Sequence, residues 1–286
     1  MIVIIGAGGF LASAFINKVC EYSDEKIVAL CRCKNEVISQ DNVSVFNCDI
    51  TDKTALNNIG NTFNNESYNI LCLAASHNID FVEQNPEIAH LINVDGTLNV
   101  FNAFPRFKRF FFTSTDAVYG EGKGVLFTEN DTPDPISEYG RQKLEAERIV
   151  LERGGTVLRL PYMYGKSLSE YKKHFTDDII HKLSNGEKVR LFTDYIRSAL
   201  TYERTAELIF NLFFVKSALP GIINLASDEL TSKYDIGLKI AMEEGLDSSL
   251  IIPETSDSAS IPFNNRVKNG GMSNSLLKEI LDLNVI

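Results

Sequence analysis

The sequence predicts an α/β fold with a doubly wound parallel sheet and a smaller C-terminal part. Short apolar runs alternate with longer helical stretches up to Leu160, a pattern typical of parallel sheets with helices on both faces. The first apolar run, Ile2–Ile5, enters a glycine-rich turn at Gly6 that opens a helix. Beyond Leu160 the alternation becomes irregular, which predicts a second part of different construction.

Six short, mostly apolar strands are predicted, at residues 2–5, 27–31, 43–47, 70–74, 110–113 and 156–160. Helices are predicted between them at residues 10–22, 53–63, 86–104 and 137–153. Pro86 stands at the first position of the third helix, where proline is tolerated. Gly154-Gly155 ends the fourth helix. A sheet of this kind binds its ligand at the carboxyl ends of its strands.

The C-terminal part is predicted from residue 161 onward, with helices at 171–185, 205–216, 233–244 and 273–281 and extended segments at 189–192 and 221–225. Residues 253–271 are mostly polar and contain two prolines, so we expect them to be largely loop. We expect residues 1–160 to form a Rossmann-type dinucleotide-binding domain, with 192–225 woven back into it. Residues 161–191 and 226–286 would form a substrate-binding lid.

Composition and charge exclude several classes of protein. The net charge is −10 and the Lys and Arg residues are scattered, so we expect no nucleic-acid partner, which needs a clustered basic face. No apolar run approaches the ~18 residues of a membrane helix, and residues 1–5 lack the basic region of a signal peptide. We therefore expect a cytoplasmic protein without a membrane partner. The five cysteines and four histidines form no ligand pattern, so we expect no metal.

The glycine-rich turn predicts a dinucleotide-binding site. Gly6, Gly8 and Gly9 permit a tight turn after the first strand. They also let backbone N–H groups at the start of the helix, near Phe10 and Leu11, approach a pyrophosphate. Such a turn is weak evidence alone, but it is strong evidence between a first strand and a first helix.

The end of the second strand predicts which dinucleotide binds. An acidic residue there would bind the ribose hydroxyls of NAD. This chain has Arg32 and Lys34 instead, and cations suit the 2′-phosphate of NADP. The sequence therefore favours NADP(H), with NAD(H) as the alternative if both side chains are only solvated surface charges.

Residues after the third and fourth strands are further candidates for the cofactor site. Asp49, next to Ile50, either accepts a hydrogen bond from the adenine amino group or favours the N-terminus of the next helix. Ala74 and Ala75 are small enough to let the cofactor lie across the sheet edge. The next two residues are candidates for substrate binding, Ser76 and His77.

Tyr139 and Lys143 lie four residues apart on a predicted helix, so they share one face. A Lys ammonium can stabilise a phenolate and lower the pKa of the phenol from about 10. The same spacing occurs in three other pairs, which begin at Tyr22, Tyr119 and Tyr162. Only the Tyr139 pair lies on a helix downstream of a hydroxyl-rich strand end, at residues 113–115. It therefore predicts proton transfer to or from a sugar or alcohol oxygen.

Taken together, these residues resemble the extended short-chain dehydrogenase/reductase family of nucleotide-sugar enzymes. The matching segments cover much of the chain: 6–12, 49, 73–75, 93–97, 113–120, 139–143 and 158–165. Within that family the chain is most similar to the dTDP-4-dehydrorhamnose reductase branch. The segments that point to the branch are 114–116, 221–225, 232–235, Arg266 and 273–276.

The resemblance implies a catalytic trio of Thr115, Tyr139 and Lys143, with Ser114 as the alternative hydroxyl. Related 4,6-dehydratases carry Thr-Asp-Glu where this chain has a Thr, an Asp and then Ala117. The missing second carboxyl argues against dehydration. The Asp of this segment, Asp116, either contacts substrate or hydrogen-bonds the loop backbone.

Three residues of the C-terminal part are candidates for substrate binding. Arg197 and Arg266 would supply cations to the substrate diphosphate, unless they are solvated surface charges. Tyr162 either touches the sugar or packs in the core.

The resemblance implies an NAD(P)-dependent reductase that reduces a nucleotide-linked 4-keto-(deoxy)sugar with NADPH, with Tyr139 as general acid. One alternative is a nucleotide-sugar 4-epimerase with tightly bound NAD. Another is a non-catalytic NADP-binding regulatory protein. The resemblance also implies a homodimer.

Overall fold

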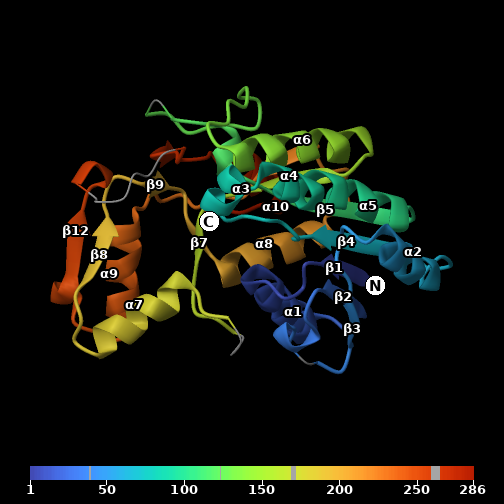
Figure 1. Cartoon of the computed structure of the whole chain (residues 1–286), viewed down its shortest axis with the longest axis horizontal. Coiled ribbons are helices and arrows are strands. Elements are labelled where there is room, and N and C mark those ends of the chain that lie inside the picture. Colours follow the sequence, from blue (N-terminus) through green and yellow to red (C-terminus); the bar gives the residue numbers. More distant parts are fainter. Residues whose placement is uncertain (39, 123, 169–171, 259–264) are drawn as a thin grey trace.

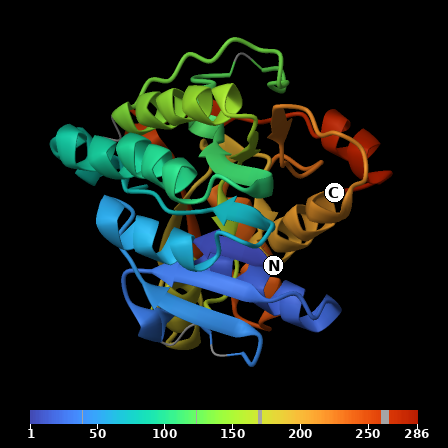
Figure 2. The same ribbon diagram turned by 90° about the vertical axis from the view of Figure 1, so that its right-hand side faces the viewer.

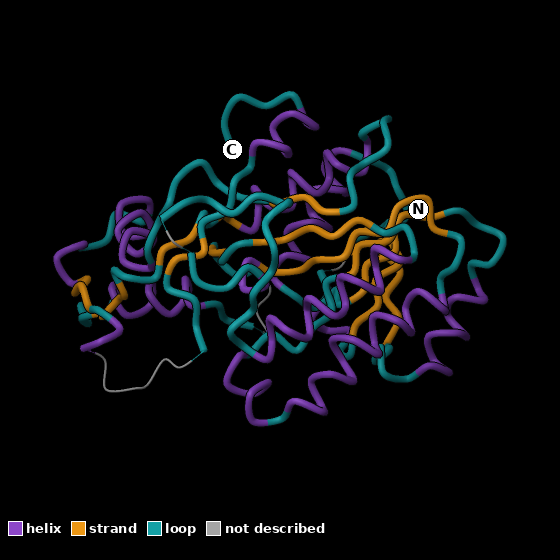
Figure 3. The backbone as a smooth tube through the Cα atoms, turned by 90° about the horizontal axis from the view of Figure 1, so that it is seen from above, coloured by secondary structure: helices purple, strands orange, loops and turns teal. Residues whose placement is uncertain are grey.

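Seven parallel strands form the central sheet of the computed structural model, in the order β11-β6-β5-β4-β1-β2-β3. The model describes residues 1–38, 40–122, 124–168, 172–258 and 265–286. The strands are β1 (Ile2–Ile5), β2 (Ile27–Cys31), β3 (Val43–Asn47), β4 (Tyr68–Cys72), β5 (Phe107–Thr115), β6 (Thr156–Leu160) and β11 (Ile222–Asn224). Figures 2 and 3 show the sheet among its helices. The strand β3 is at one edge of the sheet. The predicted fold class is confirmed.

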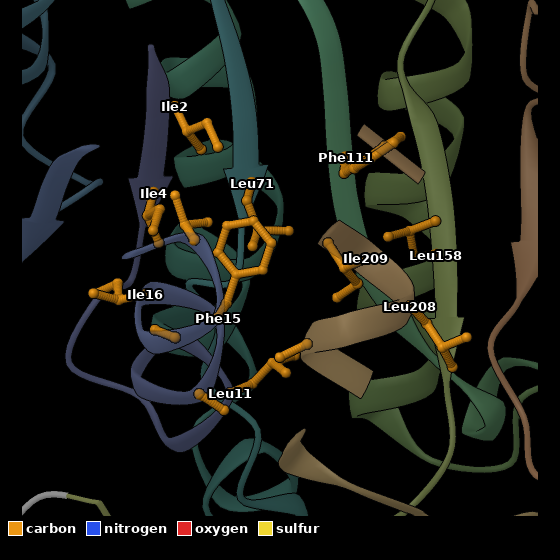
Figure 4. Close-up of a cluster of buried hydrophobic side chains, with 14 of the residues drawn as sticks. Ile2, Ile4, Leu11, Phe15, Ile16, Leu71, Phe111, Leu158, Leu208 and Ile209 are labelled. Atoms are coloured by element: carbon orange, nitrogen blue, oxygen red, sulfur yellow. The ribbon is translucent and has the colours of Figure 1, made fainter. Parts of the chain in front are cut away.

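Helices cover both faces of the sheet (Figure 1). One face carries α1 (Phe10–Tyr22) and α8 (Tyr202–Phe214), and the other carries α2 (Lys53–Thr62), α5 (Gly96–Ala103) and α6 (Glu138–Glu152). Successive strand residues point to opposite faces, so Ile4 packs with Phe15 of α1 while Ile5 packs with Val100 of α5. Figure 4 shows the first of these two clusters. Because both faces are covered, the strands read as continuous apolar runs.

The helix predicted at 86–104 is interrupted by a π-helical turn. It comprises α4 (Pro86–His90), the turn Leu91–Asp95 and α5, and a short helix, α3 (Ile79–Gln84), precedes it. The turn contains the buried Asn93, whose Oδ1 accepts from the Ser76 backbone N–H at 2.8 Å. Its Nδ2 donates to Gln142 Oε1 on α6 at 3.0 Å. Asn93 thus ties the loop after β4 to the helix that bears Tyr139.

The C-terminal part has a small core of its own. It contains α7 (Phe175–Ser184), α9 (Lys233–Glu243) and the paired strands β8 (Val189–Phe192) and β12 (Ile251–Glu254), which lie to the left of the sheet in Figure 1. Two pairs of two-residue strands connect it to the rest: β7 (Met163–Tyr164) with β10 (Leu200–Thr201), and β9 (Ile196–Arg197) with β13 (Asn269–Gly270). The last helix is α10 (Ser275–Leu281).

Several boundaries differ from the prediction. The strand predicted at 70–74 lies at 68–72, because the chain must turn away at Ala74 beside Gly6. The helix predicted from 205 begins at Tyr202, because the Thr201 side chain accepts from the Arg204 N–H and caps it. The region predicted to be loop contains β12 and β13, and its residues 259–264 lie outside the described part, as does residue 171 of another predicted helix.

The predicted ranges of the two parts stay a proposal. The pairing of β11 with β6 and the packing of α8 against α1 support the return of 192–225 to the first part. Within the described ranges, no helix has both the length and the apolar character needed to cross a bilayer.

Candidate active site

A cavity of about 700 Å³ opens at the carboxyl ends of β1, β4, β5 and β6, and the C-terminal part forms its other wall. The predicted residues that line it are Gly6, Gly9, Phe10, Leu11, Ala75, His77, Ser114, Thr115, Asp116, Tyr139, Lys143, Tyr162, Arg197 and Arg266. The predicted residues outside its lining are Gly8, Arg32, Lys34, Asp49, Ile50, Ala74 and Ser76. The catalytic candidates therefore all line one cavity, whereas several of the cofactor candidates lie outside its lining.

The glycine-rich turn lies at the switch point between β1 and β4. Gly6 has φ +86°, and a Cβ there would lie 2.7 Å from the backbone N of Ala74, so only glycine fits. The N-cap of α1, Gly9, offers no side-chain cap, and the first turn has no acidic residue. Its N–H groups are thus available to an anion at the cavity wall, which fits the pyrophosphate of a dinucleotide.

Arg32 and Lys34 are exposed and outside the cavity lining. The chain enters a short 3₁₀ turn, Lys34–Glu36, beyond the end of β2. Glu36 is the residue that reaches the glycine turn, because a Cβ on Gly8 would lie 2.5 Å from Glu36 Oε2. Lys172 Nζ lies 2.6 Å from that oxygen and donates to the Gly8 carbonyl at 2.9 Å. The structure thus brings Glu36 and Lys172, rather than the predicted pair, to this turn.

Two further cofactor candidates, Asp49 and Ile50, and the substrate candidate Ser76 have local roles. Asp49 Oδ1 accepts from the backbone N–H and the hydroxyl of Thr51, at 2.9 and 2.8 Å, and shapes the turn before α2. Ile50 is buried in the core beside Gly96. Ser76 is held through its backbone by Asn93. Each is close in sequence to a strand end, but none is directed to the cavity by the fold.

Tyr139 and Lys143 lie in the first half of α6, which is capped by Ser137 Oγ accepting from the Gly140 N–H. Lys143 is almost fully buried, its Nζ is 3.8 Å from the centroid of the Phe112 ring, and burial lowers its pKa to about 8. For Tyr139, burial and then the Asp116 carboxylate raise the pKa above its usual value. Burial therefore outweighs the expected lowering of this pKa by Lys143. The phenol is protonated at neutral pH, as a proton donor must be.

The two hydroxyl candidates at the end of β5 differ in their contacts. Thr115 Oγ1 accepts from the Ala117 N–H at 3.2 Å and donates to Asp116 Oδ1 at 3.1 Å. Its single proton is already engaged. Ser114 Oγ is buried, and within the described ranges it has no hydrogen-bond partner. Both residues line the cavity.

Arg197 and Arg266 have different partners in the structure. The Arg197 guanidinium lies 2.9 Å from Asp116 Oδ2 and donates to backbone carbonyls. Its predicted contact with a diphosphate is therefore not supported, because its donors are engaged inside the protein. Arg266 pairs with Asp80 at 2.7 Å at the cavity wall. Tyr162 both lines the cavity and packs edge-on against Phe175, with ring centroids 5.4 Å apart.

Sequence reasoning missed several polar or aromatic cavity residues, among them Lys172, His174, Tyr202 and Lys233. The His174 ring packs between Phe10 and Tyr202, at 5.2 and 5.1 Å, and burial lowers its pKa to about 4. Lys233 Nζ lies 5.2 Å from the Tyr162 ring centroid, and burial, Arg266 and Arg197 lower its pKa. The only signal for Lys233 was its place in the 232–235 segment of the resemblance.

No group of three or more His, Cys, Asp or Glu side chains in the described ranges is placed to hold a metal ion.

A glycine turn at the switch point of a doubly wound sheet, facing a hydroxyl, a Tyr and a Lys across one cavity, defines the class of short-chain dehydrogenases/reductases. A family model described as "RmlD substrate binding domain" matches residues 1–285. The chain belongs to this family, which confirms the predicted resemblance.

Solved structures with the same fold are distant in sequence. A hypothetical dTDP-4-dehydrorhamnose reductase from Sulfolobus tokodaii has a TM-score of 0.80 at 22% identity, over 99% of this chain and 96% of that one. A dTDP-4-dehydrorhamnose reductase from Bacillus anthracis, in complex with NADP, has a TM-score of 0.78 at 20% identity, over 97% and 92%. A UDP-glucose 4-epimerase from Thermotoga maritima, with UDP-glucose, has a TM-score of 0.81 at 19% identity, over 97% and 91%.

Curated relatives match only part of the chain. Methionine adenosyltransferase 2 subunit beta of Danio rerio is 27% identical over 219 residues, 74% of this chain and 66% of that protein. A probable low-salt glycan biosynthesis reductase, Agl14, of Haloferax volcanii is 30% identical over 187 residues, 64% and 61%. The matched parts thus span less than two thirds of these relatives.

Proposed function

We propose that this protein reduces the keto group of a nucleotide-linked 4-keto-(deoxy)sugar with NADPH. One observation carries the proposal: Tyr139, Lys143 and the hydroxyls at the end of β5 line the same cavity as the open N-terminus of α1. A bound nicotinamide dinucleotide would supply the hydride. The residues that would hold it are Gly6, Gly9 and the first turn of α1, through their backbone N–H groups.

Tyr139 would act as general acid. Reduction of a ketone to an alcohol adds a hydride to carbon and a proton to oxygen, and Tyr139 would supply the proton. Its raised pKa keeps the phenol protonated beforehand. The buried ammonium of Lys143 lies on the same helix face and would favour the phenolate that is left behind.

Either hydroxyl of β5 could orient the carbonyl oxygen. Thr115 would have to release Asp116 to donate a hydrogen bond, whereas Ser114 has a proton available. The variants Ser114→Ala and Thr115→Val separate the two, because the orienting hydroxyl is the one whose loss lowers kcat more.

The substrate phosphates would lie against Lys233 and Arg266. These two cations line the same cavity, and burial followed by the charge of Arg266 lowers the pKa of Lys233. An anion between them would relieve that repulsion. Tyr162, next to Lys233, would contact the sugar.

For the cofactor we propose NADP(H), with NAD(H) as the alternative. Arg32 and Lys34 lie just beyond β2 and are exposed, so their side chains are accessible to a 2′-phosphate. Glu36, which lies closer to the glycine turn, favours ribose hydroxyls and is the argument for NAD(H).

The test is a cofactor-oxidation screen with NADPH and NADH against a panel of nucleotide-4-keto-sugars. We expect oxidation of NADPH with at least one sugar. Tyr139→Phe should then lower kcat by about 10²- to 10⁴-fold. Tyr22→Phe is the matched control, since Tyr22 has the same spacing to a Lys but is exposed on α1. Absence of oxidation with every sugar would overturn the proposal.

An epimerase is the second candidate. The exposed position of Arg32 and Lys34, away from the cavity lining, removes part of the argument against NAD. Purified protein that retains NAD and interconverts two nucleotide sugars without net redox change would favour this candidate.

A binding subunit is the third candidate, favoured by the curated relatives that are named as a subunit. Intact biological activity of Tyr139→Phe would support it over both enzymes. A homodimer stays a prediction, to be measured by sedimentation.

A further inference from the structure

The Arg197 side chain uses most of its hydrogen-bonding capacity inside the protein. Its Nη1 donates to the carbonyls of Ile196 and Lys268, at 2.8 and 2.9 Å, and its Nη2 donates to the carbonyl of Val267. Its Nε lies 2.9 Å from Asp116 Oδ2. A guanidinium has five N–H groups, so little is left for a ligand. The side chain is 16% exposed.

The backbone around Arg197 is as strongly fixed as the side chain. Its N–H donates to the Thr231 carbonyl at 3.0 Å, and its carbonyl accepts from the Thr231 N–H at 2.8 Å. A Cβ on Gly270 would lie 3.1 Å from Arg197 Nε, so glycine makes room for the guanidinium against β13. Arg197 is thus the point at which three segments of the C-terminal part meet.

Asp116 is the partner of Arg197 at the end of β5. Its carboxylate is buried and divides its two oxygens between two residues: Oδ1 accepts from Thr115, and Oδ2 faces Arg197. A buried carboxylate is costly unless it is paired and hydrogen-bonded. The pair therefore fastens the Thr115 turn to the C-terminal part.

Asp116 also acts on the proton donor. Burial raises the pKa of Asp116, and this is opposed by Arg197 of β9, by Thr115 of β5 and by the backbone N–H of Ala117. Burial, and then Arg266 and Arg197, lower the pKa of Lys233. Tyr139 of α6 experiences the negative charge of the ionised Asp116. A carboxylate at this position opposes ionisation of the phenol.

We propose that Arg197 is a positioning residue for the reduction, which acts through Asp116 on Thr115 and Tyr139, and not a ligand of the substrate phosphates. The proposal rests on the proposed function, because it assigns the pair a role in that reaction. Arg197 would keep Asp116 ionised and in place, and Asp116 would hold Thr115 and keep Tyr139 protonated.

The kinetic test compares Arg197→Gln, Asp116→Asn and the double variant. We expect kcat to fall tenfold or more in each single variant, with KM for the nucleotide sugar within threefold. The alkaline limb of the kcat–pH profile should move to lower pH by about one unit in both variants, because the negative charge beside the phenol is lost. In Asp116→Asn the carboxylate is removed, and in Arg197→Gln the buried carboxyl takes up a proton because it has lost its cation. Arg204→Gln is the matched control, since Arg204 pairs with Glu207 in an exposed site away from the cavity.

The double variant separates the two effects of the pair. It should regain much of the stability lost in the single variants, because no unpaired charge is left buried. It should keep the shifted pH limb, because the charge of Asp116 is still missing. If Arg197→Gln instead raises KM tenfold and leaves kcat and the pH profile unchanged, Arg197 is a phosphate ligand and the proposal is wrong.

A second readout does not depend on turnover. Tyrosine labelled with ¹³C at Cζ reports phenol ionisation by NMR, and Tyr139→Phe assigns the Tyr139 signal. We expect this signal to titrate at lower pH in Asp116→Asn and in Arg197→Gln than in the unmodified protein. Equal titration in all three proteins overturns the inference, even if a nucleotide sugar is reduced. If no sugar is reduced but the signal shifts, only the proposed function fails.

Discussion

Arg159 and Arg197 each face a buried carboxylate, but in different regions of the molecule. Arg159 of β6 contacts both oxygens of Glu147 on α6, at 3.0 and 2.7 Å, and its guanidinium lies 4.5 Å from the Tyr119 ring. Arg197 contacts one oxygen of Asp116 and otherwise binds backbone carbonyls of the C-terminal part.

The difference shows how the two regions are held. In the first region an ion pair outside the cavity lining joins β6 to α6, the helix that bears Tyr139. In the second region two pairs of strands are only two residues long. There an ion pair, and not a long strand pairing, holds the segments together. The first pair is therefore expected to control stability, and the second to control the chemistry of the cavity.

The largest expected effect is on the first pair. Glu147→Gln leaves Arg159 charged and without its carboxylate in the core, which should lower the free energy of unfolding by about 3–5 kcal/mol. Urea unfolding measures this. Glu145→Gln on the exposed face of α6, where Glu145 lies 3.3 Å from His90 Nε2, should change it by less than about 0.5 kcal/mol. Equal small effects of both changes would contradict the distinction between the regions.

The second prediction concerns the cost of holding Lys143 in the core. Burial lowers its pKa to about 8, against about 10.4 in an unfolded chain. The folded state therefore binds the proton less well. Lys143→Met should abolish reduction and raise stability by about 2 kcal/mol at pH 7, allowing for the lost contact with Phe112.

The gain in stability of Lys143→Met should decrease as the pH rises. Below about pH 8 both states of the unmodified protein carry the proton, and the full cost is present. As the pH rises toward about 10.4 the folded state becomes neutral first, so the unmodified protein recovers stability and the gain of the variant fades. Thermal unfolding at pH 7 and pH 10 checks this, and a gain that grows with pH would refute it.

A smaller effect is expected at the substrate wall. Lys233→Met should raise KM for the nucleotide sugar about tenfold and leave kcat within twofold, because a cation that binds phosphate contributes equally to ground and transition states. Lys239→Met on the same helix is the control, since Lys239 pairs with Glu229 at the surface. Steady-state kinetics with both variants would show whether Lys233 binds substrate or only packs on Tyr162.

The smallest effect is expected at the rim beyond β2. Replacing both Arg32 and Lys34 by Ala should weaken NADPH binding about threefold and leave NADH binding unchanged, because exposed charges contribute little and are screened by salt. Fluorescence titration at low and high salt measures both affinities. An unchanged ratio of the two would mean that these side chains are only surface charges.

Much of the sheet could be predicted from local pattern. The strands at residues 2–5, 27–31, 43–47 and 156–160 and the helix that begins at Phe10 lie where the apolar runs placed them. Such runs can be recognised in the sequence because each strand is buried on both faces and is therefore mostly apolar. The Tyr139–Lys143 pair could be selected for the same reason, since its helix follows β5 in an ordered alternation.

The cavity wall of the C-terminal part could not be predicted in this way. Lys172, His174 and Lys233 lie in short segments whose neighbours are set by contacts over more than a hundred residues, such as Lys172 with Gly8. No periodicity marks such contacts. The sequence identified Arg197 as a candidate cation. Its contacts with Asp116 and with backbone carbonyls next to β13 could be established only from the folded structure.

The order of residues along this chain was thus enough to establish a doubly wound sheet, a glycine turn and a Tyr–Lys helix, because each depends on neighbours within a few turns or one strand. The protonation of Tyr139 and Lys143 depended on burial. The roles of Arg197 and Lys233 depended on which charges the folded chain brings beside them. Those are properties of packing, because a charge acts strongly on neighbouring groups only where distant segments of the chain exclude water around it.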